Sequence, residues 1–189
     1  MLDLGDRKSV YKPRQGGLKF PQDLRTNNLE ELRQHRKIHL VAACRSFARW
    51  DLDYGFAGHL TIRDPDHPEL YWTNPMAVHF AKVKLSNLIL VNHEGEVVEG
   101  EYAVNQASFV PLAAVHTAHP DILAMCHAHT LYGKAYASLG RPLPPISQDA
   151  CAFFEDHAII GDEAGQVAVE RDAGVNIAPA FKGNAAAIH

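Results

Sequence analysis

The chain has 189 residues, of which 47% are hydrophobic and 21% charged, and its net charge is −4. A chain of this length and composition can form one globular domain with a substantial core. The weak negative charge, without a basic block, argues against nucleic acid as a partner, and no apolar run approaches the roughly 18 residues of a membrane span. The three cysteines are widely spaced, which suits free thiols in the cytoplasm, and the polar N-terminus lacks the apolar core of a secretion signal.

Residues 1–25 are polar and include several prolines and glycines, which predicts a mobile arm ahead of a single domain over residues 26–189. A helix is expected to begin near Asn28, because this side chain can accept hydrogen bonds from the first turn and Glu31 completes a capping-box pattern. Residues at three- and four-residue steps predict which face of the helix meets the core: Leu32, His35, His39, Ala43, Phe47 and Trp50.

Short segments with strand-like composition follow this helix, separated by turn sequences such as DPDHPE and NHEG. We expect strands at residues 59–63, 70–73, 88–92, 96–100 and 122–129, and a further strand from residue 158. Helices are expected at residues 105–118, 130–140 and 148–156 and within residues 163–182. The closing AAAIH is typical of a buried strand that is just beginning, and such a strand needs partners. We therefore expect the domain to be incomplete at its C-terminal end.

The stretch MCHAHT, residues 125–130, places two histidines one residue apart at the end of an expected buried strand. Residues i and i+2 of a strand point to the same side, about 7 Å apart at the backbone. His127 and His129 should therefore project together, while Cys126 points to the other face. Neutral imidazole suits Zn²⁺, and catalytic zinc usually has three protein ligands. The pair predicts a metal site; two polar side chains hydrogen-bonded at a strand end are the alternative.

Other polar residues have simpler explanations. His35 and His39 have a spacing that can chelate a metal on a helix, but we expect them to line the boundary between core and solvent. His116 lies near the end of the second expected helix, where its interaction with the helix dipole accounts for it. Arg63 and Asp64 follow one another at the end of a strand and are expected to form a local ion pair or turn.

Several longer motifs occur in a recognisable order: GHLTIRDPDHPELYWTNPMAVHF, LILVNHEGEVVEG, HPDILAMCHAHTLYGKAYASLG, QDACAFFEDHAII and KGNAAAI. They cover about residues 30–189 and resemble the class II aldolase/adducin family, with most similarity to its adducin-like, stand-alone branch. The resemblance implies an α/β fold, a three-layer α/β/α domain with a central, mainly antiparallel sheet. It also implies a homo-oligomer, which in active members is a tetramer with zinc sites near the subunit contacts.

The same resemblance implies a role for the histidine pair. In the family an HxH pair supplies two zinc ligands, here His127 and His129, and a third histidine follows in a later strand with a pattern like A-A-I-L-x-N-H-G. The sequence matches the start of that pattern at residues 186–188, so His189 falls at the Leu position. The third ligand is expected beyond residue 189, unless His189 replaces it. The expected cofactor is Zn²⁺ or another divalent metal, in a site that this sequence leaves incomplete.

The sequence departs from the family pattern at two places. In the aldolases a Glu nineteen residues before the HxH pair moves the proton; counting back from His127 places Ser108 there, which is a poor base at neutral pH. The phosphate-binding turns of the family correspond to Gly58, His59, Thr61 and Asn74. We expect these four residues to bind substrate, although the usual serine and glycine set is missing.

The resemblance implies a zinc-dependent, lyase-type enzyme in which the metal stabilises the enediolate of a small hydroxy-carbonyl or sugar-derived substrate. His157 could then line the cavity, and Asp149, Glu155 or Asp156 could replace the missing Glu, although a solvated charge or a helix cap is the expected role of these carboxylates. The alternatives are a non-catalytic, adducin-like binding or scaffold protein and an inactive truncated paralogue. Actin or spectrin binding is not supported, because adducin also uses a neck and a basic tail that these 189 residues do not contain.

Overall fold

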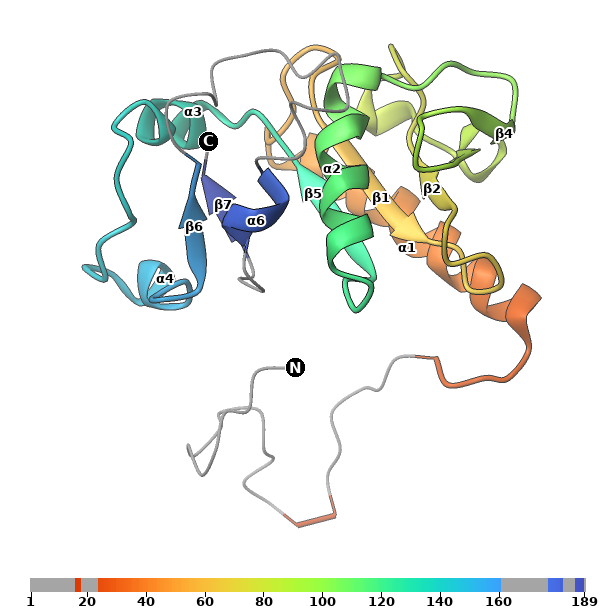
Figure 1. Cartoon of the computed structure of the whole chain (residues 1–189), viewed down its shortest axis with the longest axis horizontal. Coiled ribbons are helices and arrows are strands. Elements are labelled where there is room, and N and C mark those ends of the chain that lie inside the picture. Colours follow the sequence, from red (N-terminus) through yellow and green to blue (C-terminus); the bar gives the residue numbers. More distant parts are fainter. Residues whose placement is uncertain (1–15, 18–23, 161–176, 182–185, 189) are drawn as a thin grey trace.

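The computed structural model describes residues 16–17, 24–160, 177–181 and 186–188. Its centre is a five-stranded antiparallel sheet in the order β4-β3-β2-β1-β5. Two long helices, α1 (Leu29–Arg49) and α2 (Gln106–Ala118), cover opposite faces of this sheet (Figure 1). This arrangement confirms the expected α/β/α fold with a mainly antiparallel sheet. The strands are β1 (His59–Arg63), β2 (Tyr71–Thr73), β3 (Ile89–Val91), β4 (Val97–Glu99) and β5 (Ala124–His127).

The central strands bury side chains on both faces, because successive residues of a strand point to opposite sides. On the α1 side, Leu60, Ile62, Trp72 and Leu90 pack with Leu40, Val41 and Cys44 of the helix. On the α2 side, Tyr71, Ile89 and Val91 pack with Phe109 and Ala113. Two separate apolar layers therefore fix which side chains of β2 and β3 face each helix.

Helix α1 begins as expected and presents a different face from the expected one. The side chain of Asn28 accepts hydrogen bonds from the backbone N–H groups of Glu30 and Glu31, each at 3.1 Å. The buried residues of the helix are Leu40, Val41 and Cys44, with Ala43, Phe47 and Ala48 packed beside them. Trp50 is 67% exposed, because the helix ends at Arg49 and Trp50 is its C-cap. The predicted core-facing side of the helix is therefore wrong at Trp50 and at His39, which is also exposed.

Of the two alternatives predicted for Arg63 and Asp64, the turn forms and the ion pair does not. The backbone N–H groups of Asp66 and His67 donate to Oδ1 of Asp64 at 2.9 and 3.0 Å, within the turn that follows β1. Asp64 pairs instead with Arg33 of α1, with 2.7 Å between Oδ2 and Nε. The Arg63 guanidinium donates to backbone carbonyl groups, including that of His116 at 2.9 Å, and lies over the ring of Tyr71. Neighbours at a strand end point to opposite faces, so each of these two charges finds its partner in a different layer.

His116 is buried between α2 and the sheet. Its Nε2 lies 2.9 Å from Oγ1 of Thr61, and its ring stacks on Tyr71 with 4.6 Å between centroids. Burial, followed by the charge of Arg63, lowers the pKa of His116 to about 4. The imidazole is therefore neutral at pH 7. The expected dipole interaction needs a charged ring, so hydrogen bonding and packing account for His116 instead.

The chain continues beyond β5 through smaller elements. These are α3 (Leu131–Ala137), α4 (Gln148–Cys151), β6 (His157–Ile159), α6 (Ile177–Phe181) and β7 (Ala186–Ile188). Strands β6 and β7 form a separate parallel pair, with Ala158 opposite Ala187. The expected strand at the end of the chain is thus confirmed. His189, most of the arm at 1–25 and most of the helix expected within 163–182 lie outside the described residues. Among the helices that are described, none combines the length and apolar character needed to cross a membrane.

Candidate functional site

The two histidines of the HxH pair lie side by side at the end of β5. The strand ends at His127, and after two further residues the side chain of Thr130 accepts a hydrogen bond from Gly133 N at 3.0 Å, which caps α3. The ring centroids of His127 and His129 are 4.8 Å apart, with an angle of 50° between the ring planes. The structure therefore brings the two predicted ligands together, although His129 lies just beyond the strand.

His59 lies directly across the sheet from His127. The two residues are cross-strand partners of β1 and β5, so their side chains share the α2 face of the sheet. His59 is fully buried, and within the described part of the chain neither ring nitrogen has a hydrogen-bond partner. Burial, followed by the neighbouring His127, lowers the pKa of His59 to about 3. A neutral imidazole with two unsatisfied nitrogens is costly to bury, so His59 is a group that a ligand could satisfy.

Cys126 points to the other side of β5, as expected. Its cross-strand partner is Leu60, which belongs to the α1 layer. Burial, followed by the neighbouring Cys126, raises the pKa of Cys44 in α1 to about 12. Cys126 is exposed as a residue, but partial desolvation of its thiol still raises the pKa. Both thiols are therefore protonated at neutral pH and are poor metal ligands in this environment.

The close approach of β1 to β5 requires a glycine at position 58. Gly58 has a φ of +109°, and a Cβ atom there would lie 3.1 Å from the carbonyl oxygen of His127 and 3.2 Å from Cζ of Phe80. We expect Gly58→Ala to lower the free energy of unfolding by roughly 2–3 kcal/mol, measured by urea denaturation, because strain from the positive φ and the close contacts add. Gly55→Ala is the control, because Gly55 has a φ of +62° and nothing near its Cβ position. It should cost about 1 kcal/mol, and an equal loss in both variants would contradict a role for the contact with His127.

The other predicted substrate-binding residues already have partners inside the chain. Thr61 is hydrogen-bonded to His116, and Oδ1 of Asn74 accepts a hydrogen bond from Leu60 N at 2.9 Å. Both are buried and help to hold β1 in place. Ser108 lies in the first turn of α2 and is also buried. Binding of substrate by Gly58, His59, Thr61 and Asn74 stays a prediction, and Ser108 remains the residue at the position of the family Glu without an assigned catalytic role.

His157 has structural hydrogen bonds at both nitrogens. Leu143 N donates to its Nε2 at 2.9 Å, and its Nδ1 lies 2.6 Å from the carbonyl oxygen of Phe153. Because Nε2 accepts a hydrogen bond, the proton lies on Nδ1 in the neutral ring. His157 therefore connects β6 to Leu143 and Phe153 by hydrogen bonds, and its ring has no lone pair left for a ligand.

The helix that follows the histidine pair carries a cation, Lys134. The ammonium of Lys134 in α3 lies 3.6 Å from the ring centroid of Tyr54, which belongs to the loop before Gly58. Burial, followed by the charge of Lys134, lowers the pKa of His129. Neither Lys134 nor Tyr54 was predicted from the sequence, because their proximity depends on the meeting of α3 with a loop about 80 residues earlier in the chain. The five-residue step from His129 to Lys134 is the only sequence signal.

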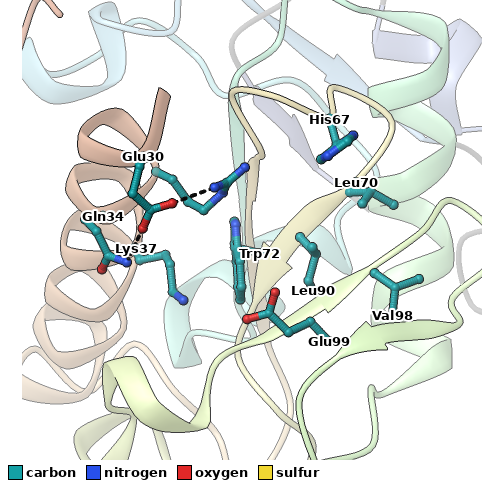
Figure 2. A pocket seen from close by; sticks show the side chains of 10 residues that line it. Glu30, Gln34, Lys37, His67, Leu70, Trp72, Leu90, Val98 and Glu99 are labelled. Atoms are coloured by element: carbon teal, nitrogen blue, oxygen red, sulfur yellow. Dashed lines mark hydrogen bonds and ion pairs between the residues drawn. The ribbon is translucent and has the colours of Figure 1, made fainter. Parts of the chain in front are cut away.

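A cavity of about 390 Å³ lies elsewhere, between α1 and the sheet on the face that α1 covers (Figure 2). Its lining includes Lys37, whose ammonium lies 3.7 Å from the ring centroid of Trp72. Arg33, which also lines it, is paired with Glu30 at 2.6 Å and with Asp64. The cavity contains none of the predicted site residues. Within the described ranges, no group of three or more His, Cys, Asp or Glu residues could hold a metal ion.

The sequence matches the family model described as Class II Aldolase and Adducin N-terminal domain over residues 38–189. The chain belongs to this family. The decarboxylase NovR of Streptomyces niveus is 42% identical over 158 residues, which cover 82% of this chain and 58% of the relative. The 4-hydroxy-3-prenylphenylpyruvate oxygenase/4-hydroxy-3-prenylbenzoate synthase of Streptomyces roseochromogenus subsp. oscitans is also 42% identical over 158 residues, covering 82% of this chain and 57% of that protein.

The fold is similar to that of L-fuculose 1-phosphate aldolase from Glaciozyma antarctica PI12. The TM-score is 0.80 and the identity 40%, with 88% of this chain and 65% of the aldolase covered. The chain therefore spans less than two thirds of the length of each of these three proteins.

Proposed function

We propose that this class II aldolase/adducin chain is a zinc-dependent or other metal-dependent enzyme of the lyase type. Its substrate would be a small hydroxy-carbonyl or sugar-derived compound. The observation that carries the proposal is the convergence of His127 and His129, whose ring centroids lie 4.8 Å apart. Support comes from His59, which is buried opposite His127 and has no hydrogen-bond partner among the described residues.

The donor set fits a divalent cation, since two neighbouring neutral imidazoles are ligands that Zn²⁺ and similar ions prefer. A cation bound there would act as a Lewis acid toward a carbonyl or hydroxyl oxygen. The pair supplies two of the three protein ligands usual for a catalytic zinc. We propose that the third comes from outside the described residues, in keeping with the family pattern that starts at residues 186–188.

The residues around the pair would orient the substrate. A neutral imidazole has one N–H donor and one acceptor nitrogen, so His59 can donate a hydrogen bond to an oxygen that becomes negative during the reaction. Its burial excludes water from that hydrogen bond. Gly58 allows the backbone of β1 to approach β5 closely enough for this placement.

The chain has Ser108 where the aldolases have a Glu, and this difference favours decarboxylation among the lyase reactions. A hydroxyl can deliver a proton or a hydrogen bond, but it does not abstract a proton at neutral pH without an adjacent base. Decarboxylation of a β-keto acid needs no initial proton abstraction, because the electrons of the breaking carbon–carbon bond move into the β-carbonyl group as CO₂ leaves, and the resulting enolate then takes up a proton. The name of the decarboxylase relative from Streptomyces niveus is consistent with this choice.

We also propose a homo-oligomer and a cytoplasmic location. Several large apolar side chains after β5 are strongly exposed, among them Leu131 (69%), Tyr132 (85%) and Ile146 (85%). Exposed apolar groups of this kind are typical of contact surfaces. Cys44, Cys126 and Cys151 are free thiols, as expected in a reducing compartment.

The second candidate function is a non-catalytic, adducin-like binding module. Ser108 is the observation that favours it, because a site without the family Glu lacks the usual proton carrier. The two functions differ in what they require of the histidine pair, since a binding module has no need for a metal at His127 and His129.

Turnover by the metal-loaded protein tests the proposal. The panel contains L-fuculose 1-phosphate for retro-aldol cleavage and acetoacetate, a β-keto acid, for decarboxylation, and mass spectrometry follows the products. We expect His129→Ala to reduce turnover by at least roughly 100-fold, because the Lewis acid is lost. His39→Ala should retain full activity, because His39 lies on α1 away from the pair. Turnover that survives the loss of His129 contradicts the proposal, and the absence of turnover with every compound favours the binding module.

A further inference from the structure

Lys134 lies in the helix that directly follows the histidine pair, and it contacts the loop that leads to His59. Helix α3 starts immediately after His129 and Thr130, and Lys134 N donates to the carbonyl of Thr130 at 2.9 Å. On the other side, the ring of Tyr54 lies 3.6 Å from the Lys134 ammonium. Tyr54 belongs to the loop that leads through Gly58 into β1. Lys134 therefore contacts the loop that leads to His59 and is part of the helix that follows His129.

The charge of Lys134 is not neutralised by a carboxylate in the part of the chain that the structure describes. No Asp or Glu oxygen forms an ion pair with its ammonium there, and its partner is the neutral face of Tyr54. Arg33, by contrast, is paired with both Glu30 and Asp64. A cation–π contact orients an ammonium without removing its charge.

We propose that Lys134, oriented by the ring of Tyr54, binds the anionic group of the substrate beside the metal-binding histidines and so determines specificity. The inference rests on the proposed function, because it requires a substrate at His127 and His129. A metal binds the reacting oxygens, and a second anchor for the remote part of the substrate fixes its orientation. The anionic group is a carboxylate or a phosphate; an ammonium on a flexible stem binds either as a point charge.

A structural role for Lys134 makes a different prediction. The lysine lies in the second half of a short helix, where a cation interacts favourably with the helix dipole, and its contact with Tyr54 ties a loop to α3. If this were its whole role, replacement of Lys134 would change stability and leave the affinity for anions unaltered. Measurements of binding and of metal content separate the two roles.

The test uses the zinc-loaded chain, freed of excess metal and titrated calorimetrically with glycolate and, separately, with inorganic phosphate. We expect Lys134→Met to weaken the binding of at least one of these anions by roughly tenfold or more, as expected for the loss of a charge-assisted hydrogen bond. Lys134→Arg should remain within about threefold of the unmodified protein, because the charge is kept. The probe with the larger loss shows whether the site favours carboxylate or phosphate.

Two further variants complete the design. Lys37→Met removes a lysine that also lies over an aromatic ring, that of Trp72, but on the face of the sheet covered by α1. This control should bind both anions normally. Tyr54→Leu should weaken anion binding less than Lys134→Met does, because the charge remains but is no longer oriented. If Lys134→Met binds zinc and both anions as tightly as the unmodified chain, this inference is overturned and the proposed function stands. A chain that binds no zinc overturns both.

Discussion

Replacing Asp64 by alanine is expected to lower the free energy of unfolding by roughly 3–5 kcal/mol. The carboxylate is 1% exposed and accepts hydrogen bonds from Nε of Arg33 at 2.7 Å and from Nε1 of Trp72 at 2.8 Å. The backbone N–H groups of Asp66 and His67 donate to its other oxygen at 2.9 and 3.0 Å. Removal of Asp64 leaves a partly buried guanidinium and a buried indole N–H without their acceptor. Helix α1 would also lose its buried ion pair with the residue that follows β1.

Asp66→Asn is the control for this prediction. Asp66 also faces Arg33, at 3.6 Å, but its side chain is 47% exposed. Exposed ion pairs contribute little, so Asp66→Asn should change the free energy of unfolding by less than about 1 kcal/mol. Urea denaturation at pH 7 measures both variants. Similar losses in the two variants would show that burial of the Asp64 network does not determine its contribution.

The contribution of Asp64 should also depend on pH. Burial alone would raise the pKa of this carboxyl, but hydrogen bonds from Arg33, Trp72 and the backbone outweigh burial and hold the pKa well below its usual value of 3.8. A carboxyl with a depressed pKa in the folded state stabilises the fold fully above its unfolded pKa and loses that effect as the pH falls. The difference in stability between the unmodified chain and Asp64→Ala should therefore be constant near pH 7 and shrink below about pH 4.

The sheet and the histidine pair could be predicted from the sequence because both depend on local patterns. Strand-like segments between turn sequences were enough to place β1 to β5, and the two-residue period of a strand was enough to put His127 and Cys126 on opposite faces. Asn28 was predicted as a helix cap because the cap depends only on the next three residues.

Features that depend on contacts between distant segments could not be predicted in this way. The pairing of Asp64 with Arg33 joins residues 31 positions apart, and the expected partner Arg63 was simply the adjacent charge. The contact between Tyr54 and Lys134 needs the loop before β1 to meet α3. The complete burial of His59 also follows from packing, since its own sequence neighbours do not show that Phe109 covers its ring.

Replacing His127 or His129 by alanine is expected to reduce the affinity for a divalent metal by more than about 100-fold. Even partners that only hydrogen-bond to metal ligands change metal affinity by roughly 10- to 100-fold when they are mutated, so a ligand itself should matter more. The double variant His35→Ala/His39→Ala is the matched control. These two rings are also close, with 4.0 Å between centroids, but they lie on α1 near its solvent boundary.

The most direct test is the metal content of the purified chain, measured by inductively coupled plasma mass spectrometry after equilibration with zinc and removal of the free ion. Circular dichroism confirms that each variant is folded. We predict about one zinc ion per chain in the unmodified protein and in the His35/His39 double variant, and almost none in His127→Ala or His129→Ala. A folded, unmodified chain without zinc, or alanine variants that keep it, would contradict the proposed metal site.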